Sequence, residues 1–169
     1  MIKYHKAAGY PAVAIASVEE RRLINELLAE IEGEHEACTI ASIGGRRDAK
    51  SGDVVDPNCA FAKAFAWCCE KGDRLLIVLD WNHLANNPAG YRPLKDSLAA
   101  LKSVGSMVIL IAPSWKMPPE LEHDVPVLEH SLPTRADLRK SLDVVSHGAN
   151  VETVAEELAE RCCDAAGTE

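Results

Sequence analysis

Short apolar runs alternate along the chain with longer stretches of mixed polarity. The runs that predict strands are residues 11–17 (PAVAIAS), 37–43 (ACTIASI), 74–80 (RLLIVLD), 107–112 (MVILIA) and, more briefly, 125–129 (VPVLE). The third and fourth runs lack any alternation of polar and apolar positions. This pattern is typical of central parallel strands that are covered on both faces.

The stretches between the strands carry the spacing and end signals of helices. They are residues 17–33 with a capping box of Ser17 and Glu20, residues 56–72 with Asp56 as N-cap and Pro57 at the first position, a helix that Pro93 opens and Gly105 ends, residues 133–145 capped by Thr134, and residues 150–163. Residues 44–53 predict a polar loop. Strands that alternate with helices indicate βαβ units and a parallel sheet.

We therefore predict an α/β fold with a five-stranded, mostly parallel sheet and helices on both faces. The α/β domain is expected over residues 1–148, with a C-terminal helix over 149–169 whose glutamates lie on a solvated face. A chain of 169 residues is long enough for one such core.

The composition of the chain disfavours several classes of function. The formal net charge of −8 disfavours binding to a nucleic-acid backbone, and no apolar run approaches the roughly 20 residues of a membrane span. None of the six cysteines forms a CxxC pair, so free thiols are favoured over a disulfide framework or a zinc site. We expect a cytoplasmic protein.

Asp80 ends the most apolar strand and has two interpretations. Carboxyl ends of parallel strands are where α/β ligand sites form, so Asp80 could hold a metal or a water near a nucleotide. It could instead cap the following turn with its short side chain. In P-loop ATPases, the position after such a strand-end aspartate usually holds a catalytic glutamate. Here that position is Trp81, and an indole cannot act as a base. His83 could form an acid–base pair with Asp80, although a loop hydrogen bond is the favoured interpretation.

The phosphate-binding loop of an ATPase is absent after the first strand. Its pattern, G-x-x-x-x-G-K-[ST], requires glycines and a lysine, whereas residues 16–22 read ASVEERR. Glu19 and Glu20 would repel phosphates there. Residues 44–51, GGRRDAKS, come within one substitution of the pattern and would use Lys50 and Ser51, but Ala49 replaces the second glycine. A solvated turn is favoured over a phosphate site.

The order of these segments resembles the P-loop-lacking, N-terminal ATPase-like domain of the two-part AAA proteins of plastids, bacteria and phages. The resemblance covers most of residues 9–145. Asp80 matches the Walker B position, MVILIAPS matches the sensor-1 strand with Ser114 near the sensor position, and PPELEHDVPVLEHSLPTRADLRKSL matches the loop, last strand and helix that follow. In that family catalysis belongs to a second ATPase domain, and residues 149–169 would be the remnant of a truncated helical lid.

The resemblance implies a non-catalytic AAA-like module that mediates self-assembly or regulates an ATPase ring. The alternative is a weak nucleotide-binding ATPase, associated with phage or nucleic acid. We expect no catalytic residue, no metal ligand and no cofactor. Any residual ATP or magnesium contact would fall to Asp80, Ser114, Lys50 and Ser51.

A partner surface is expected near the Walker B end of the sheet. Its predicted residues are Trp81, Tyr91, Trp115, Pro118 and Pro119. The partner would be another copy, with a hexamer as the family-based expectation, or an ATPase domain. The alternative is that both tryptophans cover the sheet edge within one monomer.

Overall fold

The computed structural model describes residues 2–31, 33, 35, 37–148, 160, 161 and 164. The chain divides into two compact units, residues 1–130 (unit 1) and residues 131–169 (unit 2). Unit 1 contains α1 (Ile2–Ala7), β1 (Ala12–Ala16), α2 (Glu20–Glu30), β2 (Ala37–Ser42), β3 (Gly45–Asp48), β4 (Val54–Asp56), α3 (Phe61–Glu70), β5 (Arg74–Leu79), the 3-10 turn η1 (Trp81–His83), α4 (Pro88–Val104), β6 (Met107–Ala112), α5 (Pro119–Glu122) and β7 (Val127–Glu129).

Unit 2 contains α6 (Arg135–Gly148). As predicted, Thr134 caps α6, because its Oγ1 accepts a hydrogen bond from the Asp137 backbone N–H at 3.3 Å. The helix expected over 150–163 lies outside the described residues apart from 160 and 161, so the expected division at residue 148 stays a prediction.

The predicted α/β class is confirmed, but the sheet has seven strands rather than five. Its order is β4-β3-β2-β5-β6-β1-β7. The strands from β2 to β7 in this order are the five predicted ones, and each pairs with its neighbours in parallel. The two additional strands, β3 and β4, extend the sheet in antiparallel pairing beyond β2.

Tertiary contacts explain why the predicted polar loop forms strands. Arg46 of β3 is buried, and its guanidinium carbon lies 4.2 Å from the centre of the Trp67 ring on α3. Arg74, at the start of β5, lies over the same ring at 4.5 Å. Guanidinium groups stack well on indoles. The Trp67 ring therefore covers Arg46, and β3 joins the sheet although its sequence is polar.

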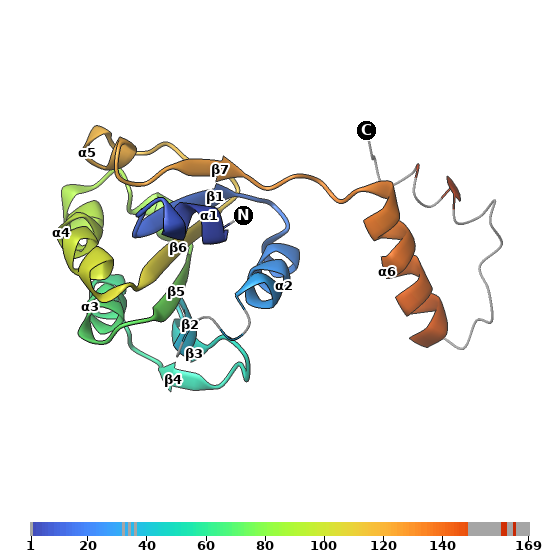
Figure 1. Ribbon diagram of the computed structural model, residues 1–169, viewed down its shortest axis with the longest axis horizontal. Coiled ribbons are helices and arrows are strands. Elements are labelled where there is room, and N and C mark those ends of the chain that lie inside the picture. The colour runs from blue at the N-terminus through green and yellow to red at the C-terminus, as the bar shows by residue number, and fades with distance from the viewer. Residues whose placement is uncertain are drawn as a thin grey trace. The chain divides into compact units, whose positions relative to one another are not determined.

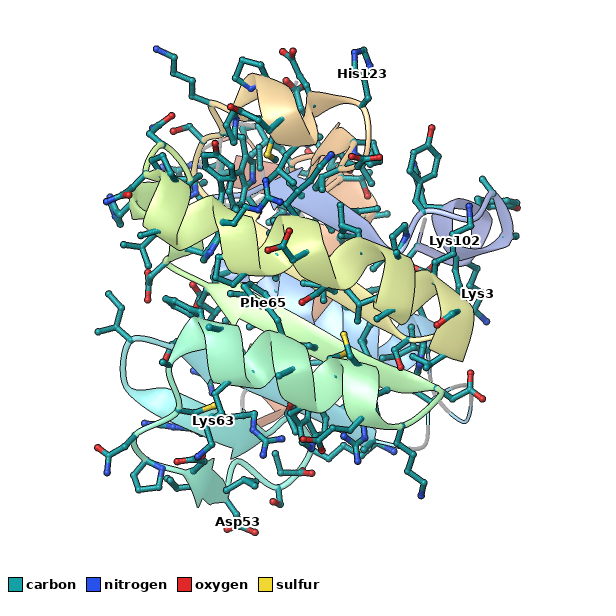
Figure 2. The ribbon with its side chains drawn as sticks, turned by 90° about the vertical axis from the view of Figure 1, so that its left-hand side faces the viewer. Lys3, Asp53, Lys63, Phe65, Lys102 and His123 are labelled. Carbon is teal, nitrogen blue, oxygen red and sulfur yellow. The ribbon has the colours of Figure 1, made fainter. Side chains whose placement is uncertain are left out.

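Helices cover both faces of the sheet (Figure 1). On one face, α3 and α4 lie side by side and pack on residues such as Leu76, Val78 and Leu110 (Figure 2). On the other face, α1 and α2 pack on Ile77 and Ile109, among others. Strands β5 and β6 are therefore buried on both faces, as their continuous apolar sequence predicted.

Two predicted helix starts were wrong. Asp56 is not an N-cap: it ends β4, and α3 begins only at Phe61, because the chain first pairs with β3. Pro93 does not open the helix that Gly105 ends. It lies inside α4, which starts at Pro88 behind an Asn87 side chain that accepts the Ala89 N–H at 3.0 Å. A proline this close to the start removes only one helical hydrogen bond.

The capping box predicted at Ser17 was also wrong. Helix α2 starts at Glu20 without a side-chain cap. Ser17 Oγ instead accepts the Glu19 N–H at 3.1 Å and hydrogen-bonds His130 Nδ1 at 2.8 Å. The other ring nitrogen of His130 lies 3.1 Å from Glu26 Oε2 on α2. Ser17 therefore hydrogen-bonds His130, which follows β7, instead of capping α2.

We predict that Gly90→Ala destabilises the protein, although alanine is the better helix former by about 1 kcal/mol. A Cβ at Gly90 would lie 2.2 Å from the Leu84 carbonyl oxygen, so α4 or the preceding turn must shift. We expect a loss of about 1–3 kcal/mol in urea unfolding. Gly44→Ala is the matched control, because its Cβ would lie 3.6 Å from Ser42 Oγ, an ordinary contact. Equal stability of both variants would contradict the close approach.

Candidate functional site

The carboxyl ends of β1, β5 and β6 meet at one edge of the sheet, where α/β proteins form their ligand sites. Their parallel registers pair Ala16 with Ala112, and Leu79 with Ile111. The turns that follow carry Glu19 and Glu20 after β1, Asp80 after β5, and Ser114 after β6. Asp80 and Ser114, the predicted Walker B and sensor-1 positions, therefore follow neighbouring strands, and the acidic turn after β1 lies at the same edge.

Carboxylates dominate this edge. Burial raises the pKa of Glu20 above its ordinary value, and the nearby charge of Asp80 raises it further. Glu19 is paired with Arg22, whose Nη2 donates to Glu19 Oε2 at 2.7 Å. The Arg22 charge is in turn shared with Glu26. The turn after β1 therefore presents Glu20 together with Asp80, and like charges of this kind disfavour a bound phosphate chain.

The backbone of Asp80 adopts a left-handed conformation at the turn after β5. Its φ of 62° and ψ of 6° are left-handed, a conformation that aspartate adopts more readily than most residues. It precedes the 3-10 turn, but its carboxylate makes no capping hydrogen bond, so the interpretation of Asp80 as a side-chain cap was wrong. The exposed carboxylate has no ion pair with another described residue.

Two indoles pack together at the carboxyl ends of β1, β5 and β6. Trp81 is fully buried, and its ring lies 6.3 Å from both the Phe65 ring and the Trp115 ring. Trp115 Nε1 donates to the Ile15 carbonyl oxygen at 2.9 Å. The expectation that Trp81 lies on a partner surface is therefore wrong for unit 1, because α3 and Trp115 enclose the ring. Pro118 is buried as well.

Three of the predicted surface residues do reach the surface. Trp115 and Tyr91 are half-buried, and Pro119 is exposed at the start of α5. Tyr91 donates from its hydroxyl to Glu120 Oε1 at 3.0 Å, which joins α4 to α5. Ser114 is exposed in the loop before Trp115.

Lys50 and Ser51 lie at the opposite edge of the sheet from Asp80. They occupy the turn between β3 and β4, where Asp48 Oδ1 accepts both of their backbone N–H groups, at 2.9 and 2.8 Å. Asp48 pairs with Thr39 near the start of β2, and the start of β2 pairs with Arg74 at the start of β5. The structure therefore does not bring Lys50 and Ser51 together with Asp80 or Ser114.

A pocket of about 510 Å³, here called the Asp80 pocket, opens beside Asp80 between the β2–β3 turn and the first turns of α3 and α4. Its apolar walls include Ile43, Phe61, Leu84 and Pro93, and its ionisable residues are Asp80, His83 and Cys59. Sequence reasoning favoured a loop hydrogen bond for His83 over an acid–base pair with Asp80, and it missed the pocket. The Asn87–Pro88 start signal of α4 could have indicated which helical turn forms its wall.

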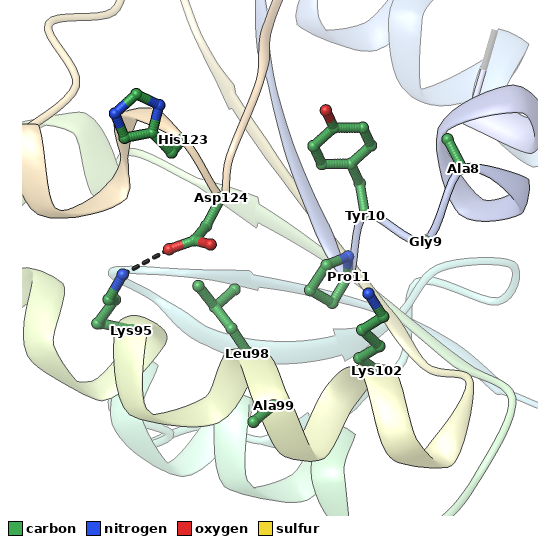
Figure 3. Close-up of a pocket in the computed structure, with 10 residues that line it drawn as sticks. All are labelled: Ala8, Gly9, Tyr10, Pro11, Lys95, Leu98, Ala99, Lys102, His123 and Asp124. Atoms are coloured by element: carbon green, nitrogen blue, oxygen red, sulfur yellow. Dashed lines mark hydrogen bonds and ion pairs between the residues drawn. The ribbon is translucent and has the colours of Figure 1, made fainter.

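A second pocket, of about 400 Å³, lies at the opposite edge, before β1 (Figure 3). Lys95, Leu98 and Lys102 of α4 line one side of it, and Lys95 pairs with Asp124. These lysines stand at the amino end of β1, so they do not offset the carboxylates at its carboxyl end.

The thiols of unit 1 are buried or half-buried. Cys38, Cys59, Cys68 and Cys69 are free, and burial raises the pKa of both Cys38 and Cys68 to about 12. Within the described residues, no group of three or more metal-ligating side chains converges. The helices of this part of the chain also lack the length and apolar character that a membrane crossing needs.

Comparison with solved structures identifies the same fold in larger proteins. The similar chains are a DNA replication initiation factor (15% identity, TM-score 0.57, covering 96% of this chain and 53% of that one), a chain of the E. coli HORMA:CdnC:Trip13 complex (15%, 0.58, 90% and 58%) and domain III of the Thermotoga maritima replication initiation protein DnaA (10%, 0.53, 98% and 77%). This chain thus spans little more than half of the first two. At these identities the similarity concerns the fold alone.

Sequence comparison is more specific. No curated protein matches the chain. Residues 2–130, which are unit 1 as the structure describes it, match the family described as "SpoVK-like AAA ATPase, N-terminal domain". The resemblance to the N-terminal ATPase-like domain of AAA proteins is thereby confirmed, and the chain belongs to the family of SpoVK-like AAA ATPase N-terminal domains.

Proposed function

We propose that the chain is a non-catalytic AAA-like module that acts through protein contacts, either in self-assembly or in the regulation of an ATPase ring. The observation that carries the proposal is the replacement of the nucleotide-binding features at the carboxyl edge of β1, β5 and β6. There the phosphate loop gives way to the turn with Glu20, and Trp81 and Trp115 fill the adjoining space.

The electrostatics of this edge support the proposal. Phosphate sites use backbone N–H groups, glycines and a lysine to offset several negative charges. Here Glu20 and Asp80 add negative charge instead, and the nearby Arg22 is committed to Glu19 and Glu26. The alternative of a weak ATPase would need Lys50 and Ser51, which lie across the sheet from Asp80.

The surface at the same edge supports action through contacts. Tyr91, Trp115 and Pro119 leave apolar area exposed around the start of α5, next to the enclosed indole of Trp81. Aromatic residues that lie at the surface of a free protein are enriched at the centres of its interfaces, where a partner buries them. A homo-oligomer, with a hexamer as the family-based expectation, or a complex with an ATPase domain would bury them.

We predict that ATP, with or without magnesium, produces no binding heat in isothermal titration calorimetry at micromolar protein concentrations. The reason is the repulsion between phosphates and the Glu20–Asp80 pair. Asp80→Asn and Lys50→Ala serve as diagnostic variants, and neither should change the result. Micromolar affinity that is lost on Asp80→Asn, or on replacing residues 15–21, would overturn the non-catalytic assignment, and loss on Lys50→Ala would place the nucleotide at the β3–β4 turn.

Glu20→Gln is predicted to stabilise the protein at pH 7. Because the pKa of Glu20 is raised in the folded state, the unfolded chain ionises Glu20 more readily above pH 4.5, and this ionisation favours unfolding. The gain should stay below about 1 kcal/mol, since Glu20 lies at the surface and is only partly shielded from solvent, and should vanish as the pH falls below 4.5. Thermal unfolding at pH 4 and pH 7 measures it. Glu122→Gln, an exposed carboxylate on α5, is the control, and an equal gain there would contradict the Glu20–Asp80 coupling.

The expected surface is tested by light scattering of the full chain over a range of concentrations. We predict concentration-dependent association that Tyr91→Glu weakens by at least tenfold in affinity, because a second carboxylate beside Glu120 would be buried in the interface. Tyr4→Glu is the matched control, since Tyr4 is 80% exposed on α1. A monomer at all concentrations, or equal effects of both substitutions, would remove the assembly surface.

A further inference from the structure

The Asp80 pocket has the size and lining of a binding site. Its volume of about 510 Å³ falls within the range of about 300–1,000 Å³ that is usual for ligand pockets. Ile43 and Leu84 line it while remaining 79% and 40% exposed. Large aliphatic side chains at the mouth of a cavity are costly to leave in water, so an apolar occupant would stabilise them.

The charged groups in and near the pocket indicate which polar group a ligand would carry next to its apolar part. No lysine or arginine lines the pocket, and the Asp80 carboxylate has no ion-pair partner among the described residues. Glu20 adds negative charge near Asp80: burial raises the pKa of Glu20, and the charge of Asp80 raises it further. A cationic group next to an aliphatic one would therefore be complementary to the pocket in both charge and polarity.

The start of α3 adds two hydrogen-bond donors at the same place. Ala60 is the N-cap and provides no side-chain cap, while the N–H groups of Lys63 and Ala64 bond the Ala60 carbonyl. The N–H groups of Phe61 and Ala62, whose residues line the pocket, have no acceptor among the described residues. They can donate hydrogen bonds to a backbone carbonyl oxygen of a peptide, which favours a protein segment over a simple amine.

We propose that the Asp80 pocket docks a segment of a protein partner in which a bulky aliphatic residue stands next to a lysine or arginine. The aliphatic side chain lies against Ile43, Leu84 and Pro93, and the cation pairs with Asp80. This inference rests on the proposed function, because it assigns a binding mode to a module that acts through protein contacts.

Three capped tetrapeptides test the proposal on the full chain by two-dimensional NMR. The probes are acetyl-Ala-Leu-Lys-Ala-amide, the same peptide with Glu in place of Lys, and the same peptide with Ala in place of Leu. We expect saturable shifts at Leu84 and Ala89 with the first probe. The other two should bind about tenfold more weakly, because one replaces attraction to Asp80 by repulsion and the other lacks the apolar anchor.

Two variants locate the site. Asp80→Asn should abolish the preference for Lys over Glu without unfolding the protein, since asparagine also tolerates the left-handed backbone of residue 80. Ala89→Phe should block all three probes, because Ala89 lines the pocket from the exposed first turn of α4. Asp53→Asn, on the remote exposed segment labelled in Figure 2, is the matched control and should leave the preference intact.

The outcomes separate this proposal from the proposed function. Equal binding of the Lys and Glu probes, shifts elsewhere on the protein, or no saturable shift would overturn the docking site and leave the absence of ATP binding untouched. Peptide binding in a protein that also binds ATP at Asp80 would retain the pocket but overturn the non-catalytic assignment. A preference for Lys that persists in Asp80→Asn would remove Asp80 as the partner of the cation.

Discussion

The aromatic cluster at the carboxyl edge of the sheet connects the elements on which the rest of unit 1 depends. Trp81 follows β5, contacts Phe65 of α3 edge to face, and packs against Trp115, which follows β6. Trp115 in turn donates its N–H to the carbonyl of Ile15 near the end of β1. Three neighbouring strand ends and a helix are therefore held by two indoles. Burial of large aromatic side chains is among the strongest single contributions to a core, so the two indoles stabilise this edge of the sheet.

The sheet retains the AAA-like fold while the chemistry of its carboxyl edge differs. The strand order and the parallel registers of β2, β5, β6, β1 and β7 bring the carboxyl ends of these strands to one edge, and the fold as a whole is similar to that of the larger solved structures. A few side chains determine the charge and the shape of the carboxyl edge. Glutamates replace the lysine and glycines of a phosphate loop, and Trp81 takes the position after Asp80 as a core residue. Fold and catalytic chemistry thus depend on separate sets of residues.

The hairpin of β3 and β4 shows how a polar segment joins the sheet. Arg46 and Arg74 both stack on Trp67, so two cations are accommodated on one indole under α3. The hairpin carries Lys50 and Ser51 away from the carboxyl edge, since antiparallel pairing with β2 reverses the chain. A motif that resembles a phosphate loop in sequence therefore ends at the wrong edge of the sheet to meet Asp80.

The sequence by itself determined the elements whose signals are local. Continuous apolar runs located β1, β2, β5 and β6, Gly105 marked the end of α4, and the residues after β1 excluded a phosphate loop. These features depend on the hydrophobicity and backbone preferences of residues close together in the chain. The tertiary structure decided the features that depend on distant partners. Arg46 becomes a strand residue only because Trp67 covers it, and Ser17 leaves its helix because His130 is within reach. Trp81 is buried rather than presented to a partner because Phe65 and Trp115 enclose it, and the pocket beside Asp80 exists only where the first turns of α3 and α4 come together. None of these contacts has a signature in the sequence, since each joins segments whose separation along the chain says nothing about their distance in the fold.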